Sequence, residues 1–125
     1  MSFVLLSADL VEAIHDAVLN PGQLPGRARD KSLEGALARV ENRLAYGMVA
    51  DACDLAAAYA VAIARGHCFN EANLHTAYQA MDACLTLHGI EIAWRTEDVG
   101  GMILRVAQGA TDEADLAAWL RALAP

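Results

Sequence analysis

The chain has 125 residues, which is enough for one domain with its own buried core. Its formal net charge is −7, and this excess of acidic residues argues against binding nucleic acid by neutralising phosphates. Hydrophobic residues make up 56% of the sequence, many of them alanine, and only three residues are proline, a composition that favours packed helices.

The first part of the sequence predicts two helices joined by a long loop. Ser7 is placed to cap a first helix, in which apolar residues recur at helical spacing over 10–18. The segment NPGQLPG at 20–26 holds two prolines and two glycines, so it is expected to be a loop, and this loop extends to Ser32. Ser32 then caps a second helix, which is expected to end at Gly47.

A central helix is predicted next. After Asp51, nearly every residue to Ala64 is apolar, so this helix has no polar face and is expected to lie at the buried centre of a bundle. Gly66 is expected to end it in the left-handed backbone conformation.

Three further helices complete the prediction. A fourth helix begins near Asn73 and ends at Gly89, and a short extended segment is expected at 90–94. Thr96 and Thr111 are the expected caps of the last two helices. The sequence therefore predicts an all-α fold, a single compact bundle of about six helices over residues 1–125.

The segment GHCFNEANLHTA at 66–77 gathers chemically useful residues where a helix begins. First-turn N–H groups lack partners within their helix, so this position attracts anions. His67 is a candidate general base, and Asn73 can donate its amide to a phosphate. Glu71 suits such a site only if a cation such as Mg²⁺ bridges it to the anion. The simpler alternative is that Glu71 and Asn73 only stabilise the helix N-terminus.

This segment resembles the HxFx(D/E)xNxR signature of the Fic/Doc (Fido) family, and more narrowly the Doc ("death on curing") toxins of toxin–antitoxin pairs. The resemblance implies a compact helical Fic-type core, and it covers essentially the whole chain in order. The other stretches that carry it are AIHDA (13–17), LPG (24–26), RVENRLAY (39–46), ARGH (64–67) and GATDEADLAAWLR (109–121).

The resemblance also implies an activity. Most Fic proteins transfer a nucleotidyl group, whereas Doc proteins are kinases that modify a threonine of elongation factor Tu and so halt translation. By position in the motif, His67 would activate the target hydroxyl, Glu71 would hold Mg²⁺ and Asn73 would contact a phosphate of ATP. The loop at 24–26 would lie beside the cleft and help to dock the target. A cognate antitoxin is expected, with a C-terminal segment that folds into an apolar groove.

The motif departs from the family at two positions. Leu74 and His75 stand where Doc proteins have lysine and arginine, so two charges that should face the triphosphate are missing. Such a phosphate clamp contributes roughly 10²–10⁵ in rate. His75, if protonated, and Arg65, the nearest arginine in sequence, are the candidates to replace it.

Three kinds of function therefore remain open. The first is a Doc-like phosphotransferase with altered phosphate contacts, or a nucleotidyl (AMP) transferase. The second is a degenerate, non-catalytic module of the same fold that binds an antitoxin or another protein. The third is a metal site built from His67, Glu71 and His75, with Cys68 nearby, although their spacing is not a recognised zinc pattern.

Further expectations concern the cellular location of the protein and the neighbouring residues His15 and Asp16. No apolar run approaches the roughly 18 residues that a spanning helix needs, and the first ten residues do not resemble a signal peptide. Three cysteines without CxxC spacing fit a reducing cytoplasm. His15 and Asp16 point about 100° apart on a helix, so they are expected at a surface or interface and not as a tight pair.

Overall fold

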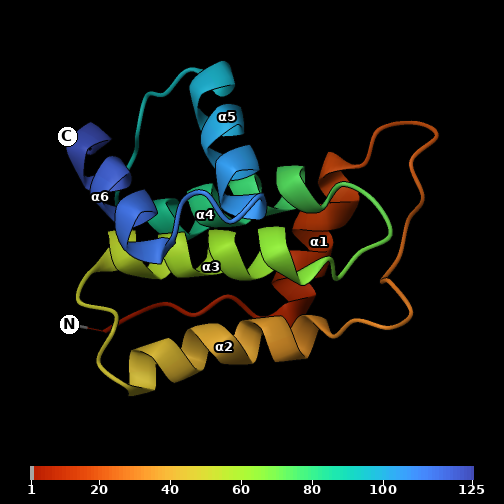
Figure 1. Cartoon of the computed structure of the whole chain (residues 1–125), viewed down its shortest axis with the longest axis horizontal. Helices are drawn as coiled ribbons and strands as arrows, with labels where there is room; N and C mark the ends of the chain where they lie inside the picture. The colour runs from red at the N-terminus through yellow and green to blue at the C-terminus, as the bar shows by residue number, and fades with distance from the viewer. Residues whose placement is uncertain (1) are drawn as a thin grey trace.

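The computed structural model describes residues 2–125, which form six helices (Figure 1). No strand occurs in this range, where the only β pairing is an isolated bridge between Arg27 and Phe69. The predicted all-α fold is therefore confirmed. The helices are α1 (Ala8–Val18), α2 (Leu33–Ala45), α3 (Ala52–Gly66), α4 (Asn73–Leu87), α5 (Thr96–Ala107) and α6 (Glu113–Leu123).

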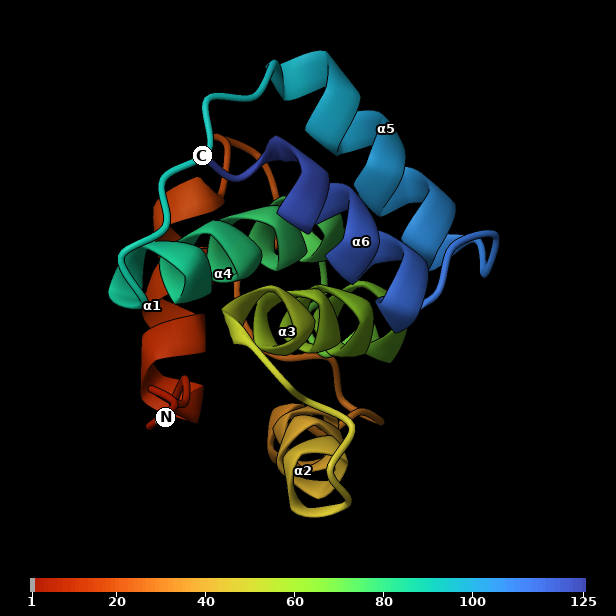
Figure 2. The same ribbon diagram turned by 90° about the vertical axis from the view of Figure 1, so that its left-hand side faces the viewer.

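Helix α3 forms the centre of the bundle. Seen end-on in Figure 2, it lies between α2 on one side and α4 and α6 on the other, and it contacts α2, α4, α5 and α6. Every residue in 55–64 is buried, as expected for a helix without a polar face. Tyr59, its largest buried side chain, accepts a hydrogen bond from the Leu6 N–H at 2.8 Å and ties the N-terminal segment to the core.

The predicted caps of the first two helices, Ser7 and Ser32, are confirmed, and Asp51 caps the third. Ser7 accepts a hydrogen bond from the Leu10 N–H, and Ser32 and Asp51 likewise accept from the N–H three residues on. Each cap satisfies one of the first-turn N–H groups that have no partner within the helix.

The last two helices begin one residue away from the positions predicted. Thr96 is the first residue of α5, not its cap. Asp112, not Thr111, caps α6, because its carboxylate accepts from the Asp115 N–H at 2.9 Å. Thr111 is buried, and its hydroxyl accepts from the Arg105 guanidinium at 3.3 Å instead.

The glycines after α2 and α4 end those helices as predicted. Gly47 and Gly89 have φ of 73° and 77°, a left-handed conformation that glycine adopts without a steric penalty. The 90–94 segment, expected to be extended, forms no strand. Across residues 2–125, none of the helices is both long and apolar enough to span a bilayer.

Candidate active site

Residues 67–72, which we call the motif loop, connect α3 to α4 through two left-handed residues that are not glycine. His67 has φ 49° and ψ 40°, and Ala72 has φ 64° and ψ 28°. The prediction that Gly66 is the left-handed residue is wrong, because Gly66 is still helical. Gly66 packs closely against the motif loop instead: a Cβ at this position would lie 2.9 Å from the Cys68 Sγ, so the Cys68 side chain would have to move.

Asn73, the first residue of α4, holds the motif loop in shape. Its Oδ1 accepts from the Phe69 N–H at 3.0 Å and its Nδ2 donates to the Phe69 carbonyl at 2.9 Å. The Phe69 side chain is buried, so the loop is fixed both through its backbone and through its ring. An amide nitrogen has two N–H groups, which leaves one of those on Asn73 for a ligand.

The N-terminus of α4 is open to an anion. Ala72 occupies the capping position and provides no side-chain hydrogen bond. Among residues 2–125 no acceptor meets the N–H groups of Asn73, Leu74 or His75. Unpaired N–H groups at the positive end of a helix dipole are the usual binding site for phosphate.

A cavity of about 460 Å³ lies against this helix end. We call it the motif cavity. Its described walls carry two imidazoles and three amides but no lysine or arginine. The lining residues are Asn20, Gln23, His67, Ala72, Asn73, Leu74, His75 and Ala107. The structure thus brings His67, Asn73 and His75 together, as the motif predicts.

Arg65 is not part of this cavity. Its Nε donates to the Val106 carbonyl at 2.9 Å and its Nη2 to the Thr111 carbonyl at 2.8 Å. These bonds anchor the connection between α5 and α6 to the end of α3. The guanidinium that was expected to replace the missing phosphate contacts is therefore engaged in holding the fold.

Glu71 joins the motif loop to the long loop of residues 19–32. Its Oε2 accepts from the Leu24 N–H, and its Oε1 has no hydrogen-bond partner among residues 2–125. The two loops also pair through their backbones: the Ala28 N–H donates to the Cys68 carbonyl at 2.8 Å, and the Asn70 N–H to the Gly26 carbonyl at 3.1 Å. The 19–32 loop thus lies directly beside the motif.

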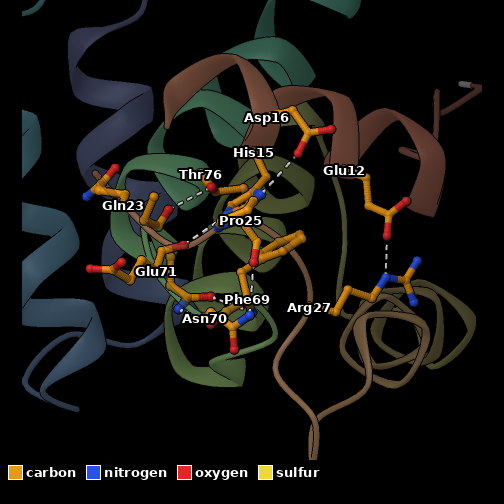
Figure 3. A network of polar contacts seen from close by, with 12 residues as sticks. Glu12, His15, Asp16, Gln23, Pro25, Arg27, Phe69, Asn70, Glu71 and Thr76 are labelled. Carbon is orange, nitrogen blue, oxygen red and sulfur yellow. Dashed lines mark hydrogen bonds and ion pairs between the residues drawn. The ribbon is translucent and has the colours of Figure 1, made fainter. Parts of the chain in front are cut away.

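Arg27 fixes the 19–32 loop to two helices. Its guanidinium donates to Glu12 of α1 and, at 2.6 Å, to Glu34 of α2. Figure 3 shows the contact with Glu12. Hydrogen bonding to Arg27 lowers the pKa of the Glu34 carboxyl. All three side chains are partly solvated, so these pairs orient the loop more than they stabilise the fold.

His15 is a site residue that the sequence analysis missed. It was expected at a surface, but the structure buries it, with 1% of its side chain exposed. Its ring stacks on Phe69 with 3.9 Å between centroids, and its Nε2 lies 2.9 Å from the Glu71 carbonyl (Figure 3). One signal pointed to this position: His15 is four residues after Val11, on the buried face of α1.

The three-ligand metal alternative has no support in residues 2–125. No group of three or more His, Cys, Asp or Glu side chains there is placed to hold one ion. One Glu71 carboxylate oxygen accepts from the Leu24 N–H, and Glu71 is not among the residues that line the cavity with His67 and His75. Burial raises the pKa of the Cys68 thiol, which disfavours the thiolate form that binds metals.

Comparison with known proteins identifies a family and a relative that match most of the chain. A sequence model of the Fic/DOC family matches residues 5–85. The chain belongs to the Fic/Doc family. It is also 32% identical over 119 residues to "Protein kinase doc" of Escherichia phage P1, and the match covers 94% of each protein. The similarity therefore runs through nearly all of both chains, not only through the motif.

Fic/Doc proteins of the kinase type generally use ATP and magnesium, and the side chains present here fit both. Mg²⁺ prefers one or two carboxylates together with phosphate oxygens. Glu71 offers such a carboxylate oxygen, its unpartnered Oε1. The uncapped N–H groups of α4 offer the phosphate contacts.

Replacing Ala72 with glycine is expected to stabilise this Fic/Doc protein. A left-handed backbone costs an L-residue roughly 1–2 kcal/mol, whereas glycine adopts it freely. The larger unfolded-state entropy of glycine offsets part of this, which leaves a gain of about 0.5–1 kcal/mol in the free energy of unfolding. Urea denaturation measures it. The control, Ala38→Gly on the exposed face of α2, should lose about 1 kcal/mol. Equal losses in both variants would contradict the strain at Ala72.

Proposed function

We propose that the protein is a Doc-like toxin of a toxin–antitoxin pair that transfers a phosphoryl group from ATP to a hydroxyl of a protein target. The observation that carries the proposal is that His67, Asn73 and the uncapped end of α4 all line the motif cavity. Its support is the similarity of nearly the whole chain to a protein kinase of the same family.

The proposed chemistry needs mainly positioning and charge neutralisation. His67 is exposed at the cavity and would accept the proton of the attacking hydroxyl. The N–H groups of α4 and the remaining N–H of Asn73 would hold phosphate oxygens. Glu71 would hold Mg²⁺, which when bound neutralises charge on the phosphates. His75 would add a positive charge only when it is protonated.

The proposed target is elongation factor Tu, with inhibition of translation in the cytoplasm as the consequence. The support for this target is the family resemblance. The 19–32 loop, hydrogen-bonded beside the motif, is the proposed place where the target segment lies. We propose further that residues 1–125 act as one Fic/Doc domain, because α5 and α6, beyond the family match, pack on α3.

The proposed partner is an antitoxin whose C-terminal segment folds on binding. An open cavity of about 520 Å³ lies between α1 and α4, with Leu10 and Ile14 on one wall and Ala83 and Leu87 on the other. A helix with an apolar face at the usual three- and four-residue spacing fits such a groove. For an acidic antitoxin segment, the net charge of −7 favours a mainly apolar contact over ion pairing.

A second candidate function is a non-catalytic module that keeps the fold and the antitoxin contact. The observation that favours it is the motif cavity without lysine or arginine in its described walls. A nucleotidyl (AMP) transferase is the remaining alternative, because the same base and the same phosphate-binding N–H groups would serve attack at the α phosphate of ATP as well as at the γ phosphate.

One experiment distinguishes the three functions. The purified protein is incubated with Mg²⁺, purified elongation factor Tu or a bacterial lysate, and ATP labelled at either the γ or the α phosphate. A His67→Asn variant is run alongside. Protein labelled from the γ position alone, and only by the unsubstituted chain, is the expected result. Label from the α position would indicate nucleotidyl transfer. Absence of both, with an antitoxin-type segment still bound, would indicate the non-catalytic module.

A further inference from the structure

We propose that His15 is a positioning residue that fixes the motif loop from the α1 side. The inference rests on the proposed function in one respect only, that the motif loop is catalytic. His15 has two contacts with this loop, a ring stack on Phe69 and a hydrogen bond to the Glu71 carbonyl (Figure 3). Both are made across a long sequence separation, from a side chain that is almost fully buried.

The hydrogen bond has a defined direction. A carbonyl oxygen only accepts, so the His15 Nε2 must carry the proton that it donates to Glu71. The other ring nitrogen, Nδ1, lies 3.5 Å from the Asp16 carboxylate. The contact with the Glu71 carbonyl therefore requires a form of the ring that carries a proton on Nε2.

The ring stack involves Phe69, the same residue whose backbone Asn73 binds. The His15 and Phe69 rings are nearly parallel, 7° apart. Asn73 binds both backbone polar groups of Phe69. His15 thus contacts the side chain of Phe69 while Asn73 binds its backbone, so the residue is held at both ends.

The hydrogen bond from His15 to the Glu71 carbonyl fixes the part of the motif loop that orients the Glu71 side chain and leads into α4. The next carbonyl, that of Ala72, accepts from the Thr76 hydroxyl at 2.7 Å. Two successive carbonyls are therefore tied to α1 and α4. Without His15, the peptide after Glu71 is free to rotate. The direction of the Glu71 carboxylate and the orientation of the α4 N–H groups would change with it.

Two substitutions separate the two contacts. His15→Phe keeps a ring that can stack on Phe69 but removes the donor to Glu71. His15→Gln places an amide N–H near the position of Nε2 but removes the ring. The matched control is His88→Phe. His88 also binds backbone groups, the Val4 N–H and the Cys84 carbonyl, but at the far end of α4.

The first readout is phosphoryl transfer. His15→Phe is expected to lower kcat about 10–100-fold, the usual effect of removing an orienting contact, with KM for ATP changed by less than about threefold. His15→Gln should recover most of this loss because it restores the donor. His88→Phe should leave kcat unchanged. A drop in kcat that is equal in the His15→Phe and His88→Phe variants would overturn the proposal.

The second readout does not depend on activity. Amide hydrogen exchange of residues 68–73 is expected to accelerate about tenfold or more in His15→Phe, with α5 and α6 unchanged. If the unsubstituted chain transfers no phosphate but this loop still loosens, the proposed function fails and the positioning role stands. If the loop exchanges at its original rate, the positioning role is overturned, whatever the activity. Should His15→Phe not fold, the same comparison is made with His15→Gln, where loss of the stack alone should accelerate exchange.

Discussion

Substituting lysine for Leu74 and arginine for His75 is expected to raise phosphoryl transfer by about 10²-fold or more. The motif cavity has no lysine or arginine among its described lining residues, so no permanently cationic side chain meets the charge on the transferred group there. Leu74 and His75 already line this cavity, so the introduced lysine and arginine side chains would reach it without a change in the backbone. The measurement is kcat/KM for transfer from γ-labelled ATP to the target protein.

Size-matched neutral substitutions are the controls for that gain. Leu74→Met and His75→Gln lengthen or retain the side chains without adding charge, and they should leave kcat/KM within about threefold. A gain that appears only with the cations would show that the remaining site is intact. No gain in an already active protein would mean that Mg²⁺ and the α4 N–H groups suffice. No gain in an inactive one would favour the non-catalytic module.

Much of the fold was predictable because it follows from local pattern. The apolar run of α3 determined its place at the centre, and Ser7, Ser32 and Asp51 act as caps through bonds to an N–H three residues away. The errors at α5 and α6 were of one residue. They arose where two neighbouring residues can each begin a helix, and the choice depends on burial, as at Thr111.

The site was less predictable because its decisive contacts are long-range. Arg65 is two residues from His67, yet its guanidinium turns to carbonyls 41 and 46 residues away. His15 reaches the Glu71 carbonyl across 56 residues. Motif spacing shows which residues can share a helix end, and it placed His67, Asn73 and His75 around one cavity. It carries no information about which distant segment packs against that end.

Removing the imidazole of His67 is expected to have the largest effect of any single substitution. Without a general base at the target hydroxyl, kcat should fall about 10²–10⁴-fold. The backbone at this position is left-handed, so the choice of replacement matters. Alanine would combine the chemical loss with backbone strain, whereas asparagine tolerates this conformation and cannot act as a base. His67→Asn therefore isolates the proton transfer, measured as label moving from γ-labelled ATP to the target.

Two comparisons make this result specific to His67. The urea midpoint of His67→Asn should match that of the unsubstituted chain, because the exposed imidazole makes no hydrogen bond within residues 2–125 and its loss leaves no buried group unpaired. His75→Asn removes the other imidazole of the cavity, and it should lower kcat by less than about tenfold, since that ring is proposed as a phosphate contact and not as the base. If His75→Asn abolishes transfer while His67→Asn retains it, the roles of the two histidines are reversed, and the base sits on α4 instead of at the end of α3.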